Sequence, residues 1–275
     1  MSGRIFHAMI KTIERGGWPR TRKIAWKTLY QFLPWIFPDR DWRFMNYGFV
    51  PEGRAPLELR PEDEPDRAFI GLYELAVTGI DTHGKTILEV GSGRGGGARY
   101  LARYHKPSEV TGLDFSTSAV RFANQHSRDW PNLKFVEGDA AALPFPNDSF
   151  DIVVNIESSH CYPDVAAFAR EVSRVLKPEG IFSFADMRSP EMTSALDRDL
   201  AAENLVMVAN LDISAGVLRG LDLAEERKIQ RLQSVKVIRN FMTEFAGMKE
   251  SALYRALQHG RVVYIARRYK KILAQ

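Results

Sequence analysis

TILEVGSGRGGG, residues 86–97, joins a short apolar run to a cluster of five glycines. The run at residues 86–90 predicts a buried strand. Glycine permits a tight turn and lets a ligand approach the backbone closely. The N–H groups that open a following helix have no partner within that helix and attract anionic groups. We therefore expect Gly91, Ser92 and Gly93 to bind a nucleotide cofactor.

Two acids near this loop narrow the choice of cofactor. Asp114 ends the next apolar run, residues 110–113, where its carboxylate can accept hydrogen bonds from both hydroxyls of a ribose. Glu89 stands two residues before the first glycine, and a buried acid is costly there unless it has a partner. A cationic amino group, or a water bound to one, is such a partner. The methionine end of S-adenosylmethionine carries this group, and nicotinamide cofactors do not.

Apolar runs and helical patterns alternate from residue 86 onward. Strands are expected at residues 86–90, 110–113, 133–136, 150–156, 181–185 and 261–269, and helices at 68–77, 99–104, 117–126, 165–176 and 250–258. Strands that alternate with helices of this length predict an α/β fold, in which helices cover both faces of a mostly parallel sheet.

Two segments depart from the alternation. Residues 1–66 are expected to form an N-terminal helical and aromatic extension to a main domain at residues 67–275. Residues 190–236 are expected to form a helical insert that acts as a lid and excludes water. The acceptor pocket is expected between the two, lined by Trp26, Tyr30, Phe32, Trp35, Phe37, Leu205, Met207, Val208 and Leu211. The basic, aromatic N-terminus could instead contact a membrane surface or exchange between the subunits of a homo-oligomer.

The composition favours a globular cytoplasmic protein. The chain is 45% hydrophobic, and its net charge of +4 is more typical of a soluble surface than of nucleic-acid binding. Cys161 is the only cysteine, which excludes a disulfide framework and a cysteine-based zinc site. We expect no membrane-spanning helix and no signal peptide.

Several motifs resemble those of the class I methyltransferases. Residues 87–96 are similar to the first motif of that family, Leu113-Asp114 to the second and Gly138-Asp139-Ala140 to the third. Residues 143–145, 149–151 and 174–180 resemble the segments that flank its fourth and fifth strands. The resemblance implies a Rossmann-like fold with seven strands, S-adenosylmethionine as cofactor and S-adenosylhomocysteine as product. It also implies that Asp139 binds the adenine amino group. Phe115, Ala140, Asn155 and Ile156 complete the predicted cofactor site.

A narrower resemblance extends over most of the chain. Residues 44–48 (FMNYG), 157–163 (ESSHCYP) and 185–188 (ADMR) resemble the mycobacterial phthiotriol dimycocerosate O-methyltransferases and related actinobacterial natural-product methyltransferases. The acceptors of that group are lipids, glycolipids and large lipophilic metabolites. The resemblance places Tyr47 in a segment that folds over the cofactor. There its hydroxyl would meet the methionine carboxylate, unless the ring is a core aromatic.

The loops after the fourth and fifth strands carry the candidate catalytic residues, because ligands in such sheets lie at the carboxyl ends of the strands. His160 is the expected general base, since an imidazole titrates near neutrality and related methyltransferases use a histidine here. It could instead cap the helix that starts near Pro163. Asp186 would orient His160 or contact the acceptor, unless it only caps its strand. Glu157 is a third candidate and could equally pair with Arg188. No group of residues has metal-ligand spacing, so no metal is expected.

The leading functional hypothesis is O-methylation of a hydroxyl on a lipophilic lipid or natural product. The first rival is C-methylation of a prenylated or polyketide-type metabolite, for which the same cofactor site would serve. A module that binds the cofactor without turnover, and a nicotinamide oxidoreductase, are more distant rivals.

Overall fold

The computed structural model describes residues 42–53, 55–232, 247–249 and 251–272. The aromatic residues predicted to line an acceptor pocket at Trp26–Phe37 lie outside these ranges, as do the predicted membrane contact and subunit exchange of the N-terminus. Within the described part of the chain, no helix is both long and apolar enough to cross a bilayer.

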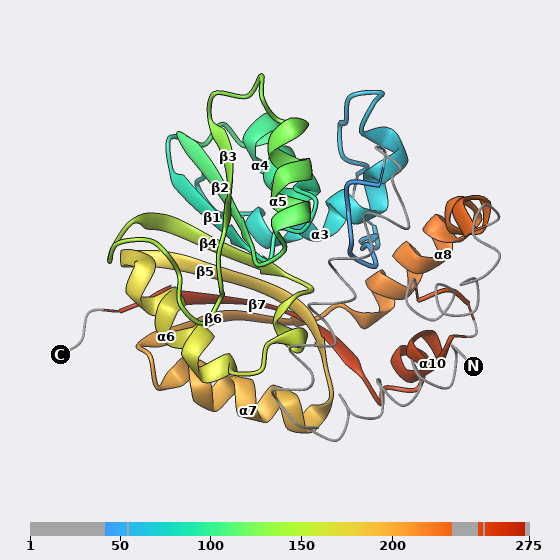
Figure 1. Ribbon diagram of the computed structural model, residues 1–275. Coiled ribbons are helices and arrows are strands. Elements are labelled where there is room, and N and C mark those ends of the chain that lie inside the picture. The colour runs from blue at the N-terminus through green and yellow to red at the C-terminus, as the bar shows by residue number, and fades with distance from the viewer. Residues whose placement is uncertain (1–41, 54, 233–246, 250, 273–275) are drawn as a thin grey trace.

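A single sheet of seven strands, in the order β3-β2-β1-β4-β5-β7-β6, runs through the protein (Figure 1). The strands from β3 to β5 are parallel, and β7 is antiparallel to both β5 and β6. This confirms the predicted Rossmann-like, mostly parallel sheet. The strands are β1 (Thr86–Val90), β2 (Glu109–Asp114), β3 (Leu133–Glu137), β4 (Phe150–Ile156), β5 (Leu176–Arg188), β6 (Leu205–Asp212) and β7 (Val263–Lys271).

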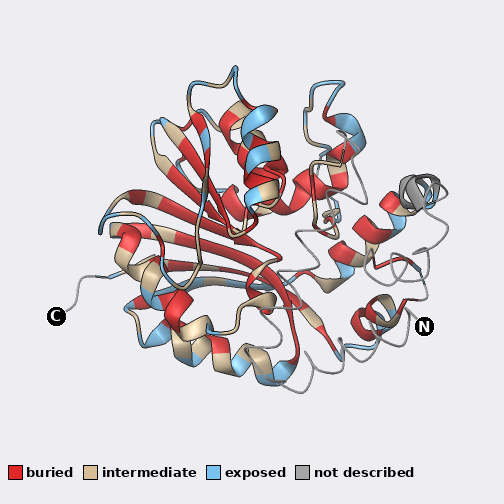
Figure 2. Cartoon of the chain, viewed as in Figure 1, coloured by how far each residue is buried: buried red, intermediate tan, exposed pale blue. Residues whose placement is uncertain are grey.

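Helices cover both faces of the sheet because its strands are apolar on both sides. Along β1, Ile87 belongs to one buried cluster and its neighbour Leu88 to another, as the two-residue period of a strand requires. The first cluster packs under α3 (Arg67–Val77), α4 (Gly96–Tyr104), α5 (Thr117–Gln125), α8 (Ser214–Leu232) and α10 (Ala252–Gln258), and the second under α6 (Val165–Val175) and α7 (Pro190–Ala201). Figure 2 shows the central strands of the sheet almost continuously buried between these layers, whereas the edge strand β6 is largely exposed.

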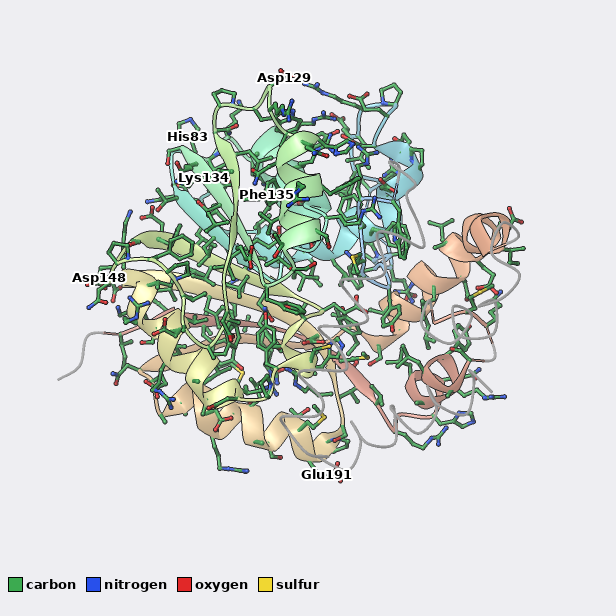
Figure 3. All side chains as sticks on the ribbon, viewed as in Figure 1. His83, Asp129, Lys134, Phe135, Asp148 and Glu191 are labelled. Carbon is green, nitrogen blue, oxygen red and sulfur yellow. The ribbon has the colours of Figure 1, made fainter. Side chains whose placement is uncertain are left out.

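Side chains fill the space between the sheet and the helices, and charged residues lie at the periphery (Figure 3). Asp129, Lys134 and Glu191 are exposed there, whereas Phe135, one residue after Lys134 on β3, is buried. This contrast between neighbours is the alternation expected of a strand near the edge of a sheet.

Residues 190–236 differ from the predicted helical insert. Between α7 and α8 the chain forms β6, which pairs with β7 at the edge of the sheet. Asn204, in the left-handed region at φ 58°, turns the chain from α7 into the strand. Leu205 is buried, but Met207, Val208 and Leu211 are 42–53% exposed on the edge strand and do not line the cavity described below. Their predicted placement at the acceptor stays a prediction, because the aromatic segment that would face them lies outside the described residues.

Residues 42–50, here called the strap, cross from the glycine loop to α3 and α8. The Phe49 N–H donates to the carbonyl of Ala68 at 2.8 Å, and the Val50 N–H donates to that of Gly216 at 3.0 Å. A Cβ at Gly71 would lie 2.1 Å from the Phe49 carbonyl oxygen, and one at Gly220 would lie 2.6 Å from the Gly48 carbonyl carbon. The strap can approach both helices this closely because neither position has a side chain.

Candidate active site

The glycine loop turns sharply at the carboxyl end of β1. Gly91, Gly93 and Gly95 have φ of 78°, 51° and 82°, in the left-handed region that favours glycine. The N–H groups of Gly91 and Ser92 donate to the Leu113 carbonyl at 2.8 and 2.9 Å, which fastens the loop to β2. The backbone thereby forms the floor of a cavity at the ends of β1, β2 and β4.

Asp114 lies beside this floor at the end of β2. Its two carboxylate oxygens accept hydrogen bonds from the N–H groups of Gly93, at 2.8 Å, and Ser116, at 2.9 Å. Burial raises the pKa of Asp114, although both hydrogen bonds oppose the rise. The carboxylate also lines the cavity, where the sequence predicts a contact with ribose hydroxyls.

Glu89 is completely buried behind the loop. The Tyr73 hydroxyl donates to one carboxylate oxygen at 2.7 Å. The other oxygen makes no hydrogen bond of good geometry with the described residues, although the Ala98 backbone N–H is near enough to lower the pKa of the carboxyl. Burial raises the pKa of Glu89 to about 8. An unpaired buried oxygen of this kind requires a donor, and Tyr73 itself lines the cavity. The arrangement fits the ammonium group of S-adenosylmethionine, reached directly or through a water.

The cavity brings together most of the predicted cofactor-binding residues. It is a partly open cavity between the strap, the glycine loop and the ends of β2 and β4. Nine residues from the predicted site line it: Gly91, Ser92, Gly93, Asp114, Phe115, Asp139, Ala140, Ile156 and Glu157. Asp139 accepts the Ala141 N–H at 3.0 Å, which fixes its carboxylate at the cavity wall.

Asn155 and Tyr47 do not line this cavity. The Asn155 amide donates to the Val90 carbonyl at 2.9 Å and to the Ser158 hydroxyl at 2.7 Å, so it supports the wall from behind. The Tyr47 ring packs against the core of the α3 face. Its backbone N–H donates to Glu157 at 2.7 Å.

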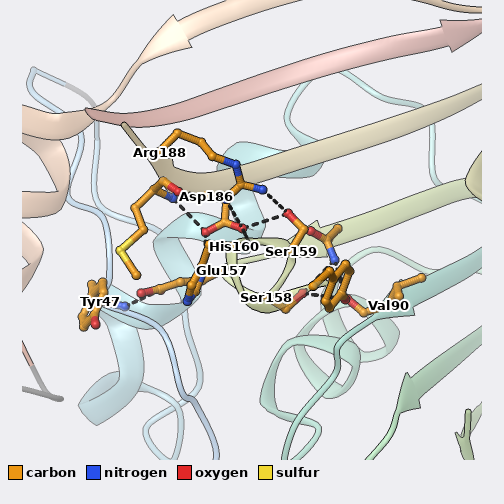
Figure 4. Close-up of polar contacts among 11 residues, drawn as sticks. Tyr47, Val90, Glu157, Ser158, Ser159, His160, Asp186 and Arg188 are labelled. Atoms are coloured by element: carbon orange, nitrogen blue, oxygen red, sulfur yellow. Dashed lines mark hydrogen bonds and ion pairs between the residues drawn. The ribbon is translucent and has the colours of Figure 1, made fainter. Parts of the chain in front are cut away.

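His160 and Asp186 form a buried pair beside the cavity (Figure 4). The imidazole Nδ1 lies 2.7 Å from one oxygen of Asp186, and the His160 backbone N–H donates to the other at 2.9 Å. Burial alone would raise the pKa of Asp186, but Arg188 and His160 hold it well below its usual range. Burial lowers the pKa of His160, and this is outweighed by Cys161 and Asp186, which raise it well above 6.5.

The imidazole lies behind the cavity wall. His160 is 4% exposed and does not line the cavity, whereas Glu157 and Cys161 on either side of it do. Glu157 adopts a left-handed backbone at φ 51°. Burial raises the pKa of its carboxyl to about 8, and the Tyr264 hydroxyl lies close by.

Two alternative roles weighed from the sequence are wrong. Helix α6 is capped by Asp164, which accepts the Ala167 N–H at 2.8 Å, and not by His160. Arg188 pairs with Asp186 at 3.0 Å instead of Glu157.

Several lining residues were missed. Arg43, Met45, Arg94 and Tyr162 also border the cavity, and the Arg94 guanidinium stacks 3.9 Å from the centre of the Phe122 ring. Arg94 lies within the quoted glycine loop and Tyr162 within the quoted 157–163 motif, so position in those motifs was an available signal. Among the described residues, no group of three or more His, Cys, Asp or Glu is arranged to hold a metal ion.

Comparisons with known proteins agree with this geometry. Residues 88–184 match the family described as a methyltransferase domain. A phthiotriol/phenolphthiotriol dimycocerosates methyltransferase of Mycobacterium tuberculosis is 37% identical over 254 residues, which cover 92% of this chain and 94% of the relative. A fatty-acid O-methyltransferase of Mycolicibacterium smegmatis is 37% identical over 83% of each chain.

A solved structure supports the fold independently. The geranyl diphosphate C-methyltransferase of Streptomyces coelicolor, in complex with S-adenosylhomocysteine, superposes with a TM-score of 0.66 at 15% identity, covering 91% of this chain and 98% of that one. The cofactor is S-adenosylmethionine. The chain therefore belongs to the S-adenosylmethionine-dependent methyltransferase family that includes the phthiotriol/phenolphthiotriol dimycocerosates methyltransferases.

Proposed function

We propose that this enzyme transfers the methyl group of S-adenosylmethionine to a hydroxyl oxygen of a lipophilic lipid or natural product. The buried His160–Asp186 pair, 2.7 Å apart beside the cofactor cavity, carries the proposal. An alcohol must lose its proton as its oxygen is methylated, and an imidazole oriented by a carboxylate is suited to accept that proton.

The cofactor supplies a methyl group on a sulfonium sulfur. As the acceptor oxygen bonds to the methyl carbon, the carbon–sulfur bond breaks and S-adenosylhomocysteine is formed. Asp186 holds His160 through Nδ1, so Nε2 is the ring nitrogen that takes the hydroxyl proton. Gly93, Asp114 and Asp139 would hold the nucleoside end, and Glu89, bonded to Tyr73 on the cavity wall, would attract the ammonium group of the amino-acid end. The strap forms one wall and excludes water from the transfer.

The names of the relatives support a lipophilic acceptor. One relative is named for phthiotriol dimycocerosates and another for fatty acids, and both names describe long apolar chains with a polar group to be methylated. We place the acceptor on the Glu157 and Cys161 side of the cavity, next to His160. A single cysteine also fits a reducing cytoplasm.

C-methylation is the second candidate. Glu157 lines the cavity, but His160 lies behind the lining residues. An oxygen nucleophile requires closer contact with the imidazole base than this position gives. An electron-rich carbon needs less help from a base. Glu157 would then accept the proton lost after the methyl group is added.

Product analysis separates the two candidates. The enzyme is incubated with S-adenosylmethionine that carries a trideuterated methyl group and with long-chain diols, fatty acids and prenyl diphosphates in turn. Mass spectrometry should find the label as a methyl ether, with Asp114→Ala as the cofactor-binding control. Label on carbon would overturn the oxygen assignment, and a methyl ester would move the acceptor to carboxylic acids.

A further inference from the structure

Arg188 is an arginine that the fold buries next to the proposed catalytic pair. It follows Asp186 by two residues on β5 and is 2% exposed. Its guanidinium donates to the Ser159 hydroxyl at 2.6 Å and to the Met187 carbonyl at 2.8 Å, and it lies 3.0 Å from the carboxylate of Asp186. Arg188 does not line the cavity, so its contacts are with the protein alone.

The Asp186 carboxylate accepts most of the hydrogen bonds in this cluster. Its oxygens accept from the His160 ring, from the Ser159 hydroxyl at 2.9 Å and from the Met187 N–H at 2.8 Å, in addition to Arg188. Ser159 therefore bridges the guanidinium and the carboxylate. With this many donors, the carboxylate cannot rotate without breaking several hydrogen bonds, and the imidazole that it holds is fixed too.

The charges of the cluster bear on the protonation of His160. Arginine remains protonated in proteins, so Arg188 and ionised Asp186 together have no net charge while the imidazole is neutral. Protonation of the imidazole gives these three side chains a net positive charge, which Arg188 makes less favourable than the His160–Asp186 pair alone would. The other titratable groups that face the cluster are Glu157, Cys161, Tyr47 and Tyr264. Burial raises the pKa of Glu157, Tyr47 and Tyr264, which favours their uncharged forms.

We propose that Arg188 is a positioning residue: it holds Asp186 in register with His160 and offsets enough of its negative charge for the imidazole to lose its proton in the working pH range. The proposal rests on His160 as the base in the proposed function. It assigns to Arg188 an effect on basicity that a residue needed only for folding would not have.

In Arg188→Met the guanidinium is absent, so the imidazolium is the only cation of the cluster that pairs with the Asp186 carboxylate. An opposite charge in contact with an ionisable group changes its pKa by roughly one to three units, and Arg188 and His160 both contact the same carboxylate, Asp186. Arg188→Met should therefore raise the pKa of His160 by at least about one unit. Arg188→Lys keeps the charge and should leave the pKa close to that of the wild type.

The direct test is a histidine titration followed by nuclear magnetic resonance on the full chain, saturated with S-adenosylhomocysteine. The His160 resonance is assigned by its loss in His160→Ala. Arg267→Met is the matched control, because Arg267 is also buried, at 6% exposure, but pairs with Asp197. Arg267→Met should leave the pKa of His160 unchanged. An unchanged His160 titration in Arg188→Met overturns the proposal.

Two further measurements keep the outcomes distinct. If Arg188→Met does not fold, as judged by loss of the thermal shift with S-adenosylhomocysteine, Arg188→Gln removes the charge and retains donors, and the same criterion applies to it. The pH profile of kcat is then recorded for each folded variant. A His160 pKa that rises while the kcat profile stays in place would uphold the role of Arg188 and refute His160 as the base.

Discussion

At the scale of single residues, Glu89 shows how an acid can be matched to a ligand that the protein itself lacks. Its carboxyl is fully buried, it has one tyrosine partner, and its pKa is raised to about 8 from an ordinary 4.5. The folded protein therefore holds a proton that the unfolded chain releases near pH 4.5. Between these values the free energy of unfolding of the free enzyme falls as the pH rises, because the native state binds more protons.

The affinity for the cofactor should depend on pH in the opposite direction to the free energy of unfolding. The ammonium group of the cofactor favours ionised Glu89, so affinity for S-adenosylhomocysteine should rise as the pH goes from 6 to 8, by up to about tenfold per unit. Calorimetry in buffers of different ionisation enthalpy should detect a released proton. Glu89→Gln should abolish the release and weaken binding.

Glu74 provides a matched control, since it also accepts a hydrogen bond from a tyrosine, Tyr100 at 2.6 Å, but lies outside the cavity and has a pKa lowered to about 2, chiefly by a hydrogen bond with His105. Glu74→Gln should leave the proton release intact. A pH-independent affinity in the wild type would contradict the role of Glu89.

His160 makes a separate prediction at this scale. Because its pKa lies above 6.5, kcat should rise with pH above that value as the imidazole loses its proton. His160→Ala should lower kcat by roughly 10²–10⁴ and remove this limb of the profile. Cofactor affinity, measured by calorimetry, should stay near the wild-type value because the ring does not line the cavity. A kcat within about threefold of the wild type would instead favour carbon methylation, since a positioned base is worth far more than that.

At the scale of elements, the sequence predicted the parallel half of the sheet well, because each strand there is a short apolar run next to a turn. β1 and β4 have the predicted bounds. β6 was missed because LVMVANLD lies between two helices and its side chains are largely exposed. Its identity as a strand depends on pairing with β7, more than fifty residues later in the chain.

The candidate site, like the sheet, could be predicted only where the local sequence pattern determines a residue's position. Residues that act through the backbone turn or a strand end, such as Gly91 and Asp114, follow from local pattern. Local pattern does not determine how deeply a side chain is buried. Glu89, Asn155 and His160 lie behind the residues that line the cavity. Their orientation depends on partners distant in sequence, such as Tyr73 and Asp186. The cavity contribution of Arg43, in the strap, had no sequence signal.

The glycine loop gives the prediction at this scale. Gly91 and Gly79 have nearly equal φ, 78° and 77°, but a Cβ at Gly91 would lie 2.4 Å from the Ser158 hydroxyl, while one at Gly79 would meet nothing within 4 Å. Each substitution by alanine should lower the free energy of unfolding by about 1–3 kcal/mol through backbone strain. Urea unfolding should show the larger loss for Gly91→Ala.

Only Gly91→Ala should also weaken binding of S-adenosylhomocysteine, because only that Cβ enters the cavity floor. Equal binding by the two variants would mean that the loop tolerates a side chain where the structure places Ser158.

At the scale of the whole molecule, the strap connects the cofactor cavity to two helices. Arg43, Met45 and Asn46 line the cavity, and the residues that follow are held against α3 and α8 by backbone hydrogen bonds. Any movement of α8 relative to the sheet must therefore also move one wall of the cofactor site.

Two glycines of α8 allow this coupling to be tested. The three atoms nearest a Cβ at Gly220 would all be backbone atoms of Gly48 and Phe49, within 2.8 Å, whereas a Cβ at Gly216 would first meet the Phe49 ring, which can rotate away. Gly220→Ala should displace the strap and speed the dissociation of S-adenosylhomocysteine in stopped-flow measurements, and Gly216→Ala should have the smaller effect. Equal dissociation rates in all three proteins would show that the strap does not control product release.

The same contact has an evolutionary consequence. A lineage in which position 220 acquires any side chain must move or lengthen its strap in the same period, since a methyl group there occupies the space of the Gly48 backbone. Displacing the strap also reshapes the cavity wall formed by Arg43, Met45 and Asn46. A single substitution on a helix that does not line the cavity would in this way alter the shape of the site, giving selection access to new acceptors without a change in any residue that touches them.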